Sequence, residues 1–367
     1  MASSNTPTSQ HLSLYRKYRP TVFDQVVGQE QVVEALKGAL QNGAIAHAYL
    51  FYGTRGTGKT SVARIFAAAL GTSSNDLYEI DAASNNSVDQ IRDLNESINT
   101  VPLQSRYKVY ILDEVHMLSK AAFNAFLKTL EEPPKHVVFI LATTELEKVP
   151  ETVISRCQVF TFKKPNRTVL RQVVESTAKS EGFAIDGDAA ELVALLGDGS
   201  FRDTHGVLQK VLSGAKKTVK RKDVERLTNA PKGELVNDLI NSIAIGDLNK
   251  ALFVVLEASR ANIDISLFVT LIIQKVRAFL LLKYSPSAES FLKEDFSSED
   301  FNMLKELVKK AGDQSGASSA NASGINSLVL SELLSVSAAI SRSVVPQAPL
   351  ELALIRLIGQ NIKATEK

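Results

Sequence analysis

The sequence predicts an α/β domain built on a parallel sheet, followed by a small helical domain and an all-helical domain. Apolar runs typical of buried strands alternate with segments of helical spacing over residues 12–163, which favours a parallel sheet covered on both faces. A glycine-rich loop joins one of these strands directly to a helix. Beyond residue 163 only helical spacing continues. We therefore expect a disordered tail at 1–11 and domains at 12–163, 164–229 and 230–367.

The elements of the first domain follow from the spacing of its apolar residues. The strands are short and nearly all apolar, whereas the helices place apolar residues three and four positions apart. The expected strands are Ala48–Tyr52, Leu77–Asp81, Lys108–Leu112, Val137–Ala142 and Gln158–Phe162. The expected helices are Gln29–Gln41, Ser61–Leu70, the segment through Val88, Ile91 and Leu94, and Ala121–Glu131.

The glycine-rich loop fits the pattern G-x-x-x-x-G-K-[ST] in full and lies between a predicted strand and a predicted helix. Such a loop wraps a phosphate with its backbone N–H groups, at the positive end of the helix that follows. Lys59 would reach the β- and γ-phosphates, and the Thr60 hydroxyl would bind magnesium. The residues expected to hold the nucleotide here are Gly53, Thr54, Arg55, Gly56, Thr57, Gly58, Lys59, Thr60 and Ser61.

Two acids follow the strand Lys108–Leu112. Downstream of a phosphate loop, an apolar strand that ends in two acids is the second element of nucleotide hydrolysis. Asp113 would hold magnesium, directly or through water, and Glu114 would polarise the attacking water as general base. The next strand, Val137–Ala142, is followed by two threonines, of which Thr144 can sense the γ-phosphate or orient water.

The part beyond residue 163 carries one further motif. The segment from Gly199 to Asp203 opens a predicted helix that carries Arg202. From Pro231 onward the apolar residues keep helical spacing, and we find no catalytic constellation there. This last third therefore reads as an assembly module.

Composition limits the function classes. The hydrophobic fraction of 44% and the charged fraction of 22% are ordinary for a soluble globular protein. No run approaches the roughly 18 apolar residues of a membrane span, and the first ten residues lack an apolar signal region, so we expect a cytoplasmic protein without membrane contact. The net charge of +2 confines nucleic-acid contact to local clusters. The single cysteine, Cys157, excludes an internal disulfide and a multi-cysteine zinc site.

Together these motifs resemble the clamp-loader branch of the AAA+ ATPases and, more narrowly, the bacterial DNA polymerase III gamma/tau family. The resemblance is dense over residues 12–212 and thins in the last third. The segments that carry it are Leu14–Pro20, Val27–Glu30, His47–Phe51, Glu79–Ser84, Asp113–Ser119, Leu127–Pro134, Ser155–Cys157 and Gly199–Asp203. It implies an AAA+ domain, a helical lid domain and a helical collar that forms oligomers.

The resemblance also implies roles for residues outside the nucleotide motifs. Arg156 would be an arginine finger that acts on ATP in the neighbouring subunit, and Arg202 would be a lid sensor that contacts the phosphates in its own chain. The residues expected to wrap the adenine and phosphates are Arg16, Arg19, Val26 and Val27. Contact with DNA along the inside of a ring would involve Asn86, Arg92 and Lys120, through side chains and helix N-termini.

The chain departs from the family pattern in two places. The family usually carries a four-cysteine zinc module where this chain has only Gly71–Asp76, so we expect ATP and magnesium but no zinc. The long tail typical of tau subunits is also missing, which suggests a form of gamma length.

The function implied is that of an ATPase motor subunit, which loads the sliding clamp onto primer-template DNA at the nucleoid. It implies as partners delta and delta-prime subunits, further copies of the chain, the clamp and DNA. Three alternatives remain open: an AAA+ branch-migration helicase, a structural loader subunit of the delta-prime type, and a P-loop kinase. A helical region after residue 230 argues against the first, the intact Lys59, Asp113 and Glu114 against the second, and Arg156 against the third.

Overall fold

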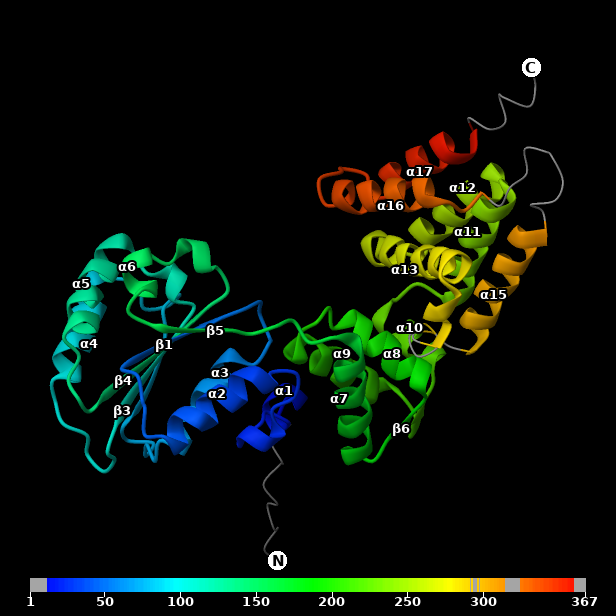
Figure 1. Cartoon of the computed structure of the whole chain (residues 1–367). Helices are drawn as coiled ribbons and strands as arrows, with labels where there is room; N and C mark the ends of the chain where they lie inside the picture. The colour runs from blue at the N-terminus through cyan, green and yellow to red at the C-terminus, as the bar shows by residue number, and fades with distance from the viewer. Residues whose placement is uncertain (1–11, 291, 293–295, 297, 314–323, 360–367) are drawn as a thin grey trace, which may run out of the picture. The chain divides into compact units, whose positions relative to one another are not determined.

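The computed structural model describes residues 12–290, 292, 296, 298–313 and 324–359 (Figure 1). The predicted tail at 1–11 lies outside these residues. The chain divides into two compact units. Unit 1 holds the residues up to Thr177 together with Val193–Gln209, and unit 2 holds Ala178–Leu192 and the residues from Lys210 onward. The division into three domains at residues 164 and 230 stays a prediction.

Unit 1 is built on a five-stranded parallel sheet with the strand order β2-β3-β4-β1-β5. Its three central strands are buried at almost every position, as expected for a sheet covered on both faces. The strands are β1 (Ala48–Tyr52), β2 (Leu77–Asp81), β3 (Lys108–Asp113), β4 (Val137–Thr143) and β5 (Gln158–Thr161). The predicted parallel sheet, with helical parts after it, is confirmed.

Helices pack on both faces of this sheet (Figure 1). One core forms between the sheet and α4 and α5, and the other between the sheet and α2 and α3. The helices and turns of unit 1 are α1 (Leu14–Lys17), η1 (Phe23–Gln25), α2 (Glu30–Gln41), α3 (Lys59–Ala69), α4 (Val88–Ile98), η2 (Val115–Met117), α5 (Lys120–Glu131), η3 (Leu146–Lys148), α6 (Glu151–Ile154) and most of α7 (Arg167–Ser180). Helix α9 (Phe201–Gly214) begins in unit 1 and ends in unit 2.

Unit 2 is mainly helical, but the prediction of a purely helical segment after residue 163 was incomplete. Two strands of two residues each, β6 (Ala184–Ile185) and β7 (Thr218–Val219), pair in parallel. A strand of two residues is too short to show the alternation of apolar and polar residues by which strands are predicted from sequence. Helix α8 (Gly187–Leu196) begins in unit 2 and ends in unit 1. The remaining elements of unit 2 are α10 (Arg221–Thr228), α11 (Gly233–Ile245), α12 (Leu248–Arg260), α13 (Ile265–Tyr284), η4 (Pro286–Ala288), α15 (Ser298–Asp313), α16 (Ser327–Ile340), α17 (Ala348–Leu354) and the π-helical turn η6 (Ile355–Gly359).

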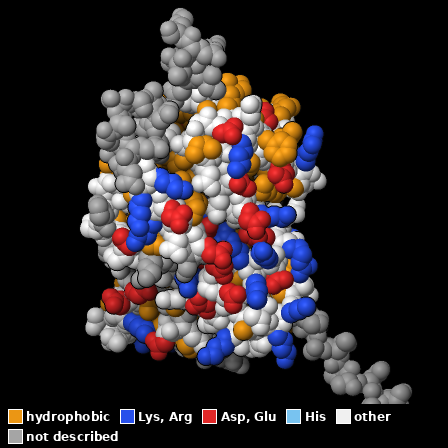
Figure 2. Space-filling model, turned by 90° about the vertical axis from the view of Figure 1, so that its right-hand side faces the viewer, with side chains coloured by type: hydrophobic (Ala, Val, Ile, Leu, Met, Phe, Trp, Pro, Cys, Tyr) orange, Lys and Arg blue, Asp and Glu red, His pale blue; other side chains and the backbone are white. Residues whose placement is uncertain are grey.

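Helix α13 forms the centre of the bundle in unit 2, where it contacts α11, α15 and α16. Among the described residues it is the one helix long and apolar enough to cross a membrane, with a mean hydropathy of 1.9. Phe268, Ile272 and Phe279 on this helix are fully buried in the bundle, which gives its apolar character a packing role. The expectation that the chain makes no membrane contact stays a prediction. On the face shown in Figure 2, basic and acidic side chains are interspersed, in keeping with the net charge of +2.

Candidate functional site

The predicted phosphate loop connects β1 to α3 in unit 1. Gly56 and Gly58 have φ angles of +75° and +103°, in the left-handed region that favours glycine. A Cβ on Gly53 would lie 2.5 Å from the carbonyl oxygen of Phe162, so no side chain fits there. The loop therefore curves tightly into the N-terminus of α3, where backbone N–H groups without intrahelical partners can bind an anion.

Lys59 is the first residue of α3 and is 5% exposed. Its Nζ donates hydrogen bonds to the carbonyl oxygens of Gly53 at 2.7 Å and Thr54 at 3.1 Å. Burial lowers the pKa of Lys59, while the nearby carboxylates of Glu114 and Asp113 act in the opposite direction. The ammonium group is thus held inside the loop by neutral acceptors.

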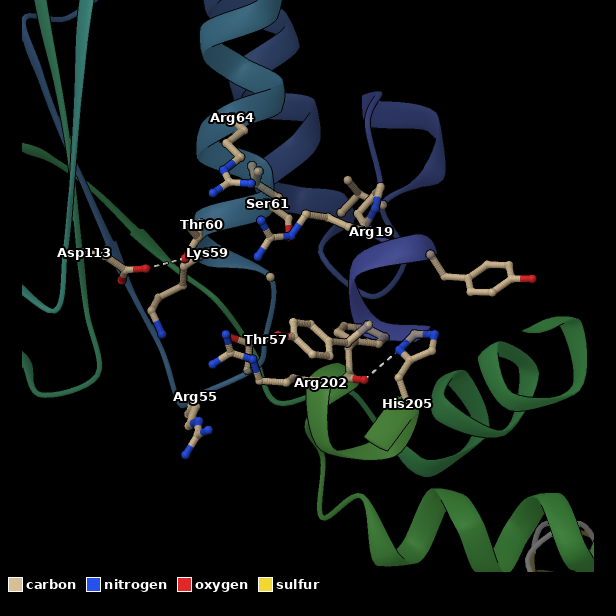
Figure 3. A pocket seen from close by; sticks show the side chains of 18 of the residues that line it. Arg19, Arg55, Thr57, Lys59, Thr60, Ser61, Arg64, Asp113, Arg202 and His205 are labelled. Atoms are coloured by element: carbon tan, nitrogen blue, oxygen red, sulfur yellow. Dashed lines mark hydrogen bonds between the residues drawn. The ribbon is translucent and has the colours of Figure 1, made fainter. Parts of the chain in front are cut away.

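Thr60 and Asp113 meet at the carboxyl end of β3. The Thr60 hydroxyl donates a hydrogen bond of 2.6 Å to Asp113 Oδ2 (Figure 3). These two residues are 53 positions apart in the chain, and the sequence predicted both as magnesium ligands. Two adjacent oxygen donors fit magnesium, which binds proteins through one or two oxygen groups and keeps several waters.

Glu114 follows Asp113 in a left-handed backbone conformation, with φ +49° and ψ +46°. Such a conformation is uncommon for a residue with a side chain and is often found at functional sites. The Thr144 hydroxyl donates a hydrogen bond of 3.1 Å to Glu114 Oε2. The predicted general base and the predicted sensor threonine are therefore in direct contact.

These groups border a pocket of about 450 Å³ whose lining lies within unit 1 (Figure 3). The sequence-predicted residues that line it are Arg19, Val26, Val27, Arg55, Gly56, Thr57, Gly58, Lys59, Thr60, Ser61, Asp113, Glu114 and Arg202. The predicted residues Gly53, Thr54, Thr144 and Arg16 do not line it. Gly53 and Thr54 instead act through their carbonyl oxygens, and Arg16 donates a hydrogen bond from Nε to the Tyr15 hydroxyl at the surface.

Cationic side chains gather in this pocket. Arg19, Arg55 and Arg202 line it together with Lys59 and Arg64 (Figure 3). Burial lowers the pKa of Arg19, and the positive charge of Arg64 adds to this effect. Arg64 forms an ion pair with Glu79, a pocket residue on β2. These five cations share the pocket lining with four carboxylates, Glu79, Asp81, Asp113 and Glu114. A mixed lining of this kind suits a polyanion bound together with a divalent cation, such as a nucleoside triphosphate with magnesium.

Sequence reasoning missed an aromatic part of the pocket. The rings of Tyr18 and His205 stack with centroids 6.2 Å apart and planes inclined by 6°. The Arg202 guanidinium carbon lies 5.2 Å from the centre of the Tyr15 ring. The backbone N–H of Leu14 also donates to Gln209 Oε1 at 3.0 Å. The only sequence signal for this part of the pocket was the spacing of His205, three residues after Arg202. That spacing places both side chains on one side of α9.

His205 is neutral in this setting. Burial lowers its pKa, although its bond to the Phe201 carbonyl oxygen favours the protonated ring. Nδ1 lies 2.8 Å from that carbonyl oxygen and Nε2 lies 3.3 Å from the Thr177 hydroxyl. Nδ1 therefore carries the proton, since a carbonyl can only accept.

Arg156 lies outside the pocket, on the turn between α6 and β5. It donates hydrogen bonds to the Thr152 carbonyl oxygen at 2.8 Å and to Glu131 Oε1 at 2.7 Å. Its side chain is 34% exposed. An exposed ion pair of this kind contributes little stability, about 0–1 kcal/mol, so Arg156 can exchange Glu131 for another anion at small cost.

The three candidate DNA residues lie on α4, on α5 and on the loop before α4. The Ser119 N–H donates a hydrogen bond of 3.4 Å to the Asn86 carbonyl oxygen, which brings Asn86 close to Lys120 at the start of α5. Arg92 lies one turn into α4 and is exposed. Asn86 and Lys120 therefore flank two neighbouring helix N-termini.

The match to known proteins is clearest in sequence. The DNA polymerase III subunit gamma of Buchnera aphidicola is 34% identical over 295 residues, which cover 75% of this chain and 80% of that protein. The chain belongs to the DNA polymerase III gamma/tau family. The DNA polymerase III subunit tau of Bacillus subtilis is 38% identical over 317 residues, or 81% of this chain, but only 56% of that relative's length is matched. The resemblance predicted from the sequence is confirmed.

Two further comparisons agree. The family model described as DNA polymerase III, delta subunit matches residues 28–79 and 71–166. The RuvB Holliday junction branch migration motor of Thermotoga maritima is similar in fold, with a TM-score of 0.51 over 67% of this chain and 86% of that chain at 20% identity. This likeness concerns the fold alone.

The residues that the structure describes include no group of three or more His, Cys, Asp or Glu side chains able to hold a metal ion. At the place where the family's zinc module would stand, the carboxylate of Asp76 accepts hydrogen bonds from the backbone N–H groups of Leu103, Gln104 and Ser105 at 2.6–2.9 Å. The absence of zinc stays a prediction.

Proposed function

We propose that this chain is an ATP-driven motor subunit of a DNA clamp loader. Its pocket would bind ATP with magnesium, and hydrolysis would drive the loading of a sliding clamp onto primed DNA. The observation that carries the proposal is the convergence of Lys59, the Thr60–Asp113 pair and Glu114 on one pocket, in a chain of the gamma/tau family.

Binding would rely on charge and on the shape of the loop. Lys59 would exchange the carbonyl oxygens of Gly53 and Thr54 for phosphate oxygens. Thr60 and Asp113 would hold magnesium, which neutralises charge on the phosphates when bound. Val26 and Val27 offer an apolar surface for the base. Arg202 would contact the phosphates and report their presence to α9.

Hydrolysis would require two groups on different chains. Glu114 would accept a proton from the attacking water, while its bond to Thr144 sets the direction of the carboxylate. Arg156 does not line the pocket of its own chain and pairs instead with Glu131. It would therefore stabilise the charge that develops on ATP in a neighbouring copy, as arginine fingers do.

This arrangement calls for an assembly. The proposed partners are delta and delta-prime subunits, further copies of this chain, the sliding clamp and primer-template DNA, in the cytoplasm at the nucleoid. The helical part of unit 2 would form the collar between subunits. Asn86 and Lys120 would contact the DNA backbone, with Arg92 as a further candidate, and binding would weaken steeply as salt rises.

ATP turnover of the purified protein tests the proposal. It should be measured for the chain alone, with delta and delta-prime subunits, and after adding clamp and primed DNA. Glu114→Gln should bind ATP without hydrolysing it. Arg156→Ala should keep ATP affinity but lower the stimulated rate about a thousandfold or more. Arg226→Ala is the matched control, because Arg226 is an exposed arginine paired with Asp223 in unit 2.

Strong stimulation that needs both clamp and primed DNA supports the loader. Stimulation by DNA alone, without an effect of the clamp, would assign the chain to the helicase class. ATP binding with no turnover in any mixture would make it a structural subunit.

A further inference from the structure

His116 takes no part in the mechanism proposed above. Its side chain is only 6% exposed and lies directly behind Glu114. Nδ1 is 3.0 Å from the Thr143 hydroxyl and 3.5 Å from Glu114 Oε2. Nε2, on the other side of the ring, is 3.3 Å from Glu145 Oε1. One buried ring therefore stands between two carboxylates.

The ring is held at the end of β4 from both sides, because Thr143 contacts Nδ1 and Glu145 contacts Nε2. The Thr143 hydroxyl donates to the Glu145 carbonyl oxygen at 3.2 Å and accepts from the Glu145 N–H at 3.1 Å. Glu145 also forms an ion pair of 2.8 Å with Lys148. The hydrogen bond from Lys148 lowers the pKa of Glu145, and the charges of Lys148 and His116 add to this effect, against a smaller opposing effect of burial. Glu145 is thus ionised and holds the His116 ring at Nε2.

The Nδ1 side of the ring faces Glu114, whose backbone is already constrained. The left-handed conformation of Glu114 persists only where neighbouring contacts hold it. Two contacts meet on Glu114 Oε2: the Thr144 hydroxyl at 3.1 Å and His116 Nδ1 at 3.5 Å. Both contacts are made by Oε2 of a residue that also lines the pocket.

We propose that His116 is a positioning residue for Glu114. Thr143 and Glu145 fix the imidazole through Nδ1 and Nε2, and the Nδ1 edge of the fixed ring holds the Glu114 carboxylate beside Thr144, in the direction that serves water activation. This inference rests on the proposed function, because it assigns Glu114 the role of general base. A histidine that merely fills space would make no difference to the rate once the fold is kept.

Two substitutions separate the two ring nitrogens. His116→Asn places an amide near the position of Nδ1 and keeps the contact with Glu114. His116→Gln places an amide near the position of Nε2 and keeps only the contact with Glu145. His116→Ala removes both contacts. His136→Gln is the matched control, because His136 bonds to the carbonyl oxygens of Ile98 and Thr100, away from Glu114.

The experiment measures kcat and KM for ATP in the stimulated assembly, together with ATPγS affinity and the melting temperature of each variant. We expect His116→Gln and His116→Ala to lower kcat about 10- to 100-fold, by analogy with the loss of groups that orient metal-binding side chains. His116→Asn should stay within about threefold of wild type. KM, ATPγS affinity and melting temperature should change little in His116→Asn and His116→Gln.

The outcomes separate the two proposals. A wild-type assembly that never hydrolyses ATP overturns the proposed function and the inference with it. An active wild type whose His116→Ala and His116→Gln variants keep full kcat overturns the inference alone. An equal loss of kcat in His116→Asn and His116→Gln also overturns the inference, because the contact at Nδ1 then makes no contribution to the rate. A crystal structure of His116→Ala should show the Glu114 carboxylate turned away from Thr144, and an unmoved carboxylate would also contradict the proposal.

Discussion

Lys59 in unit 1 and Lys275 in unit 2 are both buried, at 5% and 3% exposed, yet their surroundings differ in kind. The Nζ of Lys275 lies 2.5 Å from Asp300 Oδ1 and 2.6 Å from Asn237 Oδ1. The Nζ of Lys59 bonds to two backbone carbonyl oxygens. Burial lowers the pKa of both lysines. One ammonium has a carboxylate partner inside the fold, and the other is held by neutral groups.

The difference separates a structural charge from a functional one. Burying a charge is costly unless it is paired and hydrogen-bonded. Asp300 meets that requirement for Lys275, and Arg221 Nη1 lies 3.6 Å from the other oxygen of Asp300. Lys59 keeps its charge available, because carbonyl oxygens release it to a phosphate more readily than a carboxylate would. The predictions below test this distinction.

The largest effect is expected from Lys59→Ala. Stimulated ATP turnover should fall by at least about a hundredfold, because a cation that stabilises the phosphates in the transition state is lost. Stability should change little, since no carboxylate loses its partner. Turnover and thermal melting of the same preparation check both statements. Turnover within threefold of wild type would mean that Lys59 is as structural as Lys275.

Lys275→Met should have the opposite effects to Lys59→Ala: stability should fall and nucleotide binding should be kept. The substitution leaves Asp300 buried with its main cation gone, which costs about 3–5 kcal/mol. Hydrogen exchange of the α13 amides measures this loss inside unit 2, while affinity for ATPγS in unit 1 should hold.

The double variant Lys275→Met with Asp300→Leu controls for packing. It should recover most of the lost stability, because apolar groups of similar size replace a buried ion pair at little cost. If the α13 amides of the double variant exchange as fast as those of Lys275→Met, stability was lost through poor packing. The unpaired charge of Asp300 would then not be the cause.

The sequence could predict the functional lysine but not the structural one. Lys59 belongs to a spacing that is complete within eight residues, so strand, loop and helix all follow from local pattern. Lys275 and Asp300 lie on different helices, and no local pattern joins them. The same limit hid the stacking of Tyr18 on His205 and the two carboxylates around His116. Contacts that join distant segments depend on the packing of the whole unit, which spacing does not encode.

Asp76 in unit 1 is a buried carboxylate, as Asp300 is in unit 2. Burial raises the pKa of Asp76, but the backbone N–H groups of Leu103 and Gln104, together with Ser105 and Ser73, outweigh it and lower the pKa well below its usual range. A lowered pKa contributes stability above the unfolded value of about 3.9, and that stability is lost as pH falls through the folded value. Asp76 has N–H donors where Asp300 has cations.

Asp76→Asn should therefore be less stable than wild type at pH 7, by an amount that does not vary between pH 5 and 8. The gap should shrink as pH falls below about 4. Urea unfolding followed by circular dichroism across this pH range measures it. A gap that widens in acid would contradict the sign of the pKa shift. A gap that shrinks as salt rises at pH 7 would mean that a cation, rather than the N–H groups, holds this carboxylate.

The smallest effect is expected at Tyr15, whose ring contacts a second cation of the pocket, Arg202. Arg202 lines the pocket while its guanidinium carbon lies 5.2 Å from the Tyr15 ring centre. Like Lys59, it is held by a neutral group, here an aromatic face. Tyr15→Leu should weaken ATPγS binding about two- to fivefold through loss of the cation–π contact, and Tyr15→Phe should not. Tighter binding in Tyr15→Leu would show that the ring competes with the phosphates for Arg202, so that neutral partners in this pocket restrain its cations rather than present them.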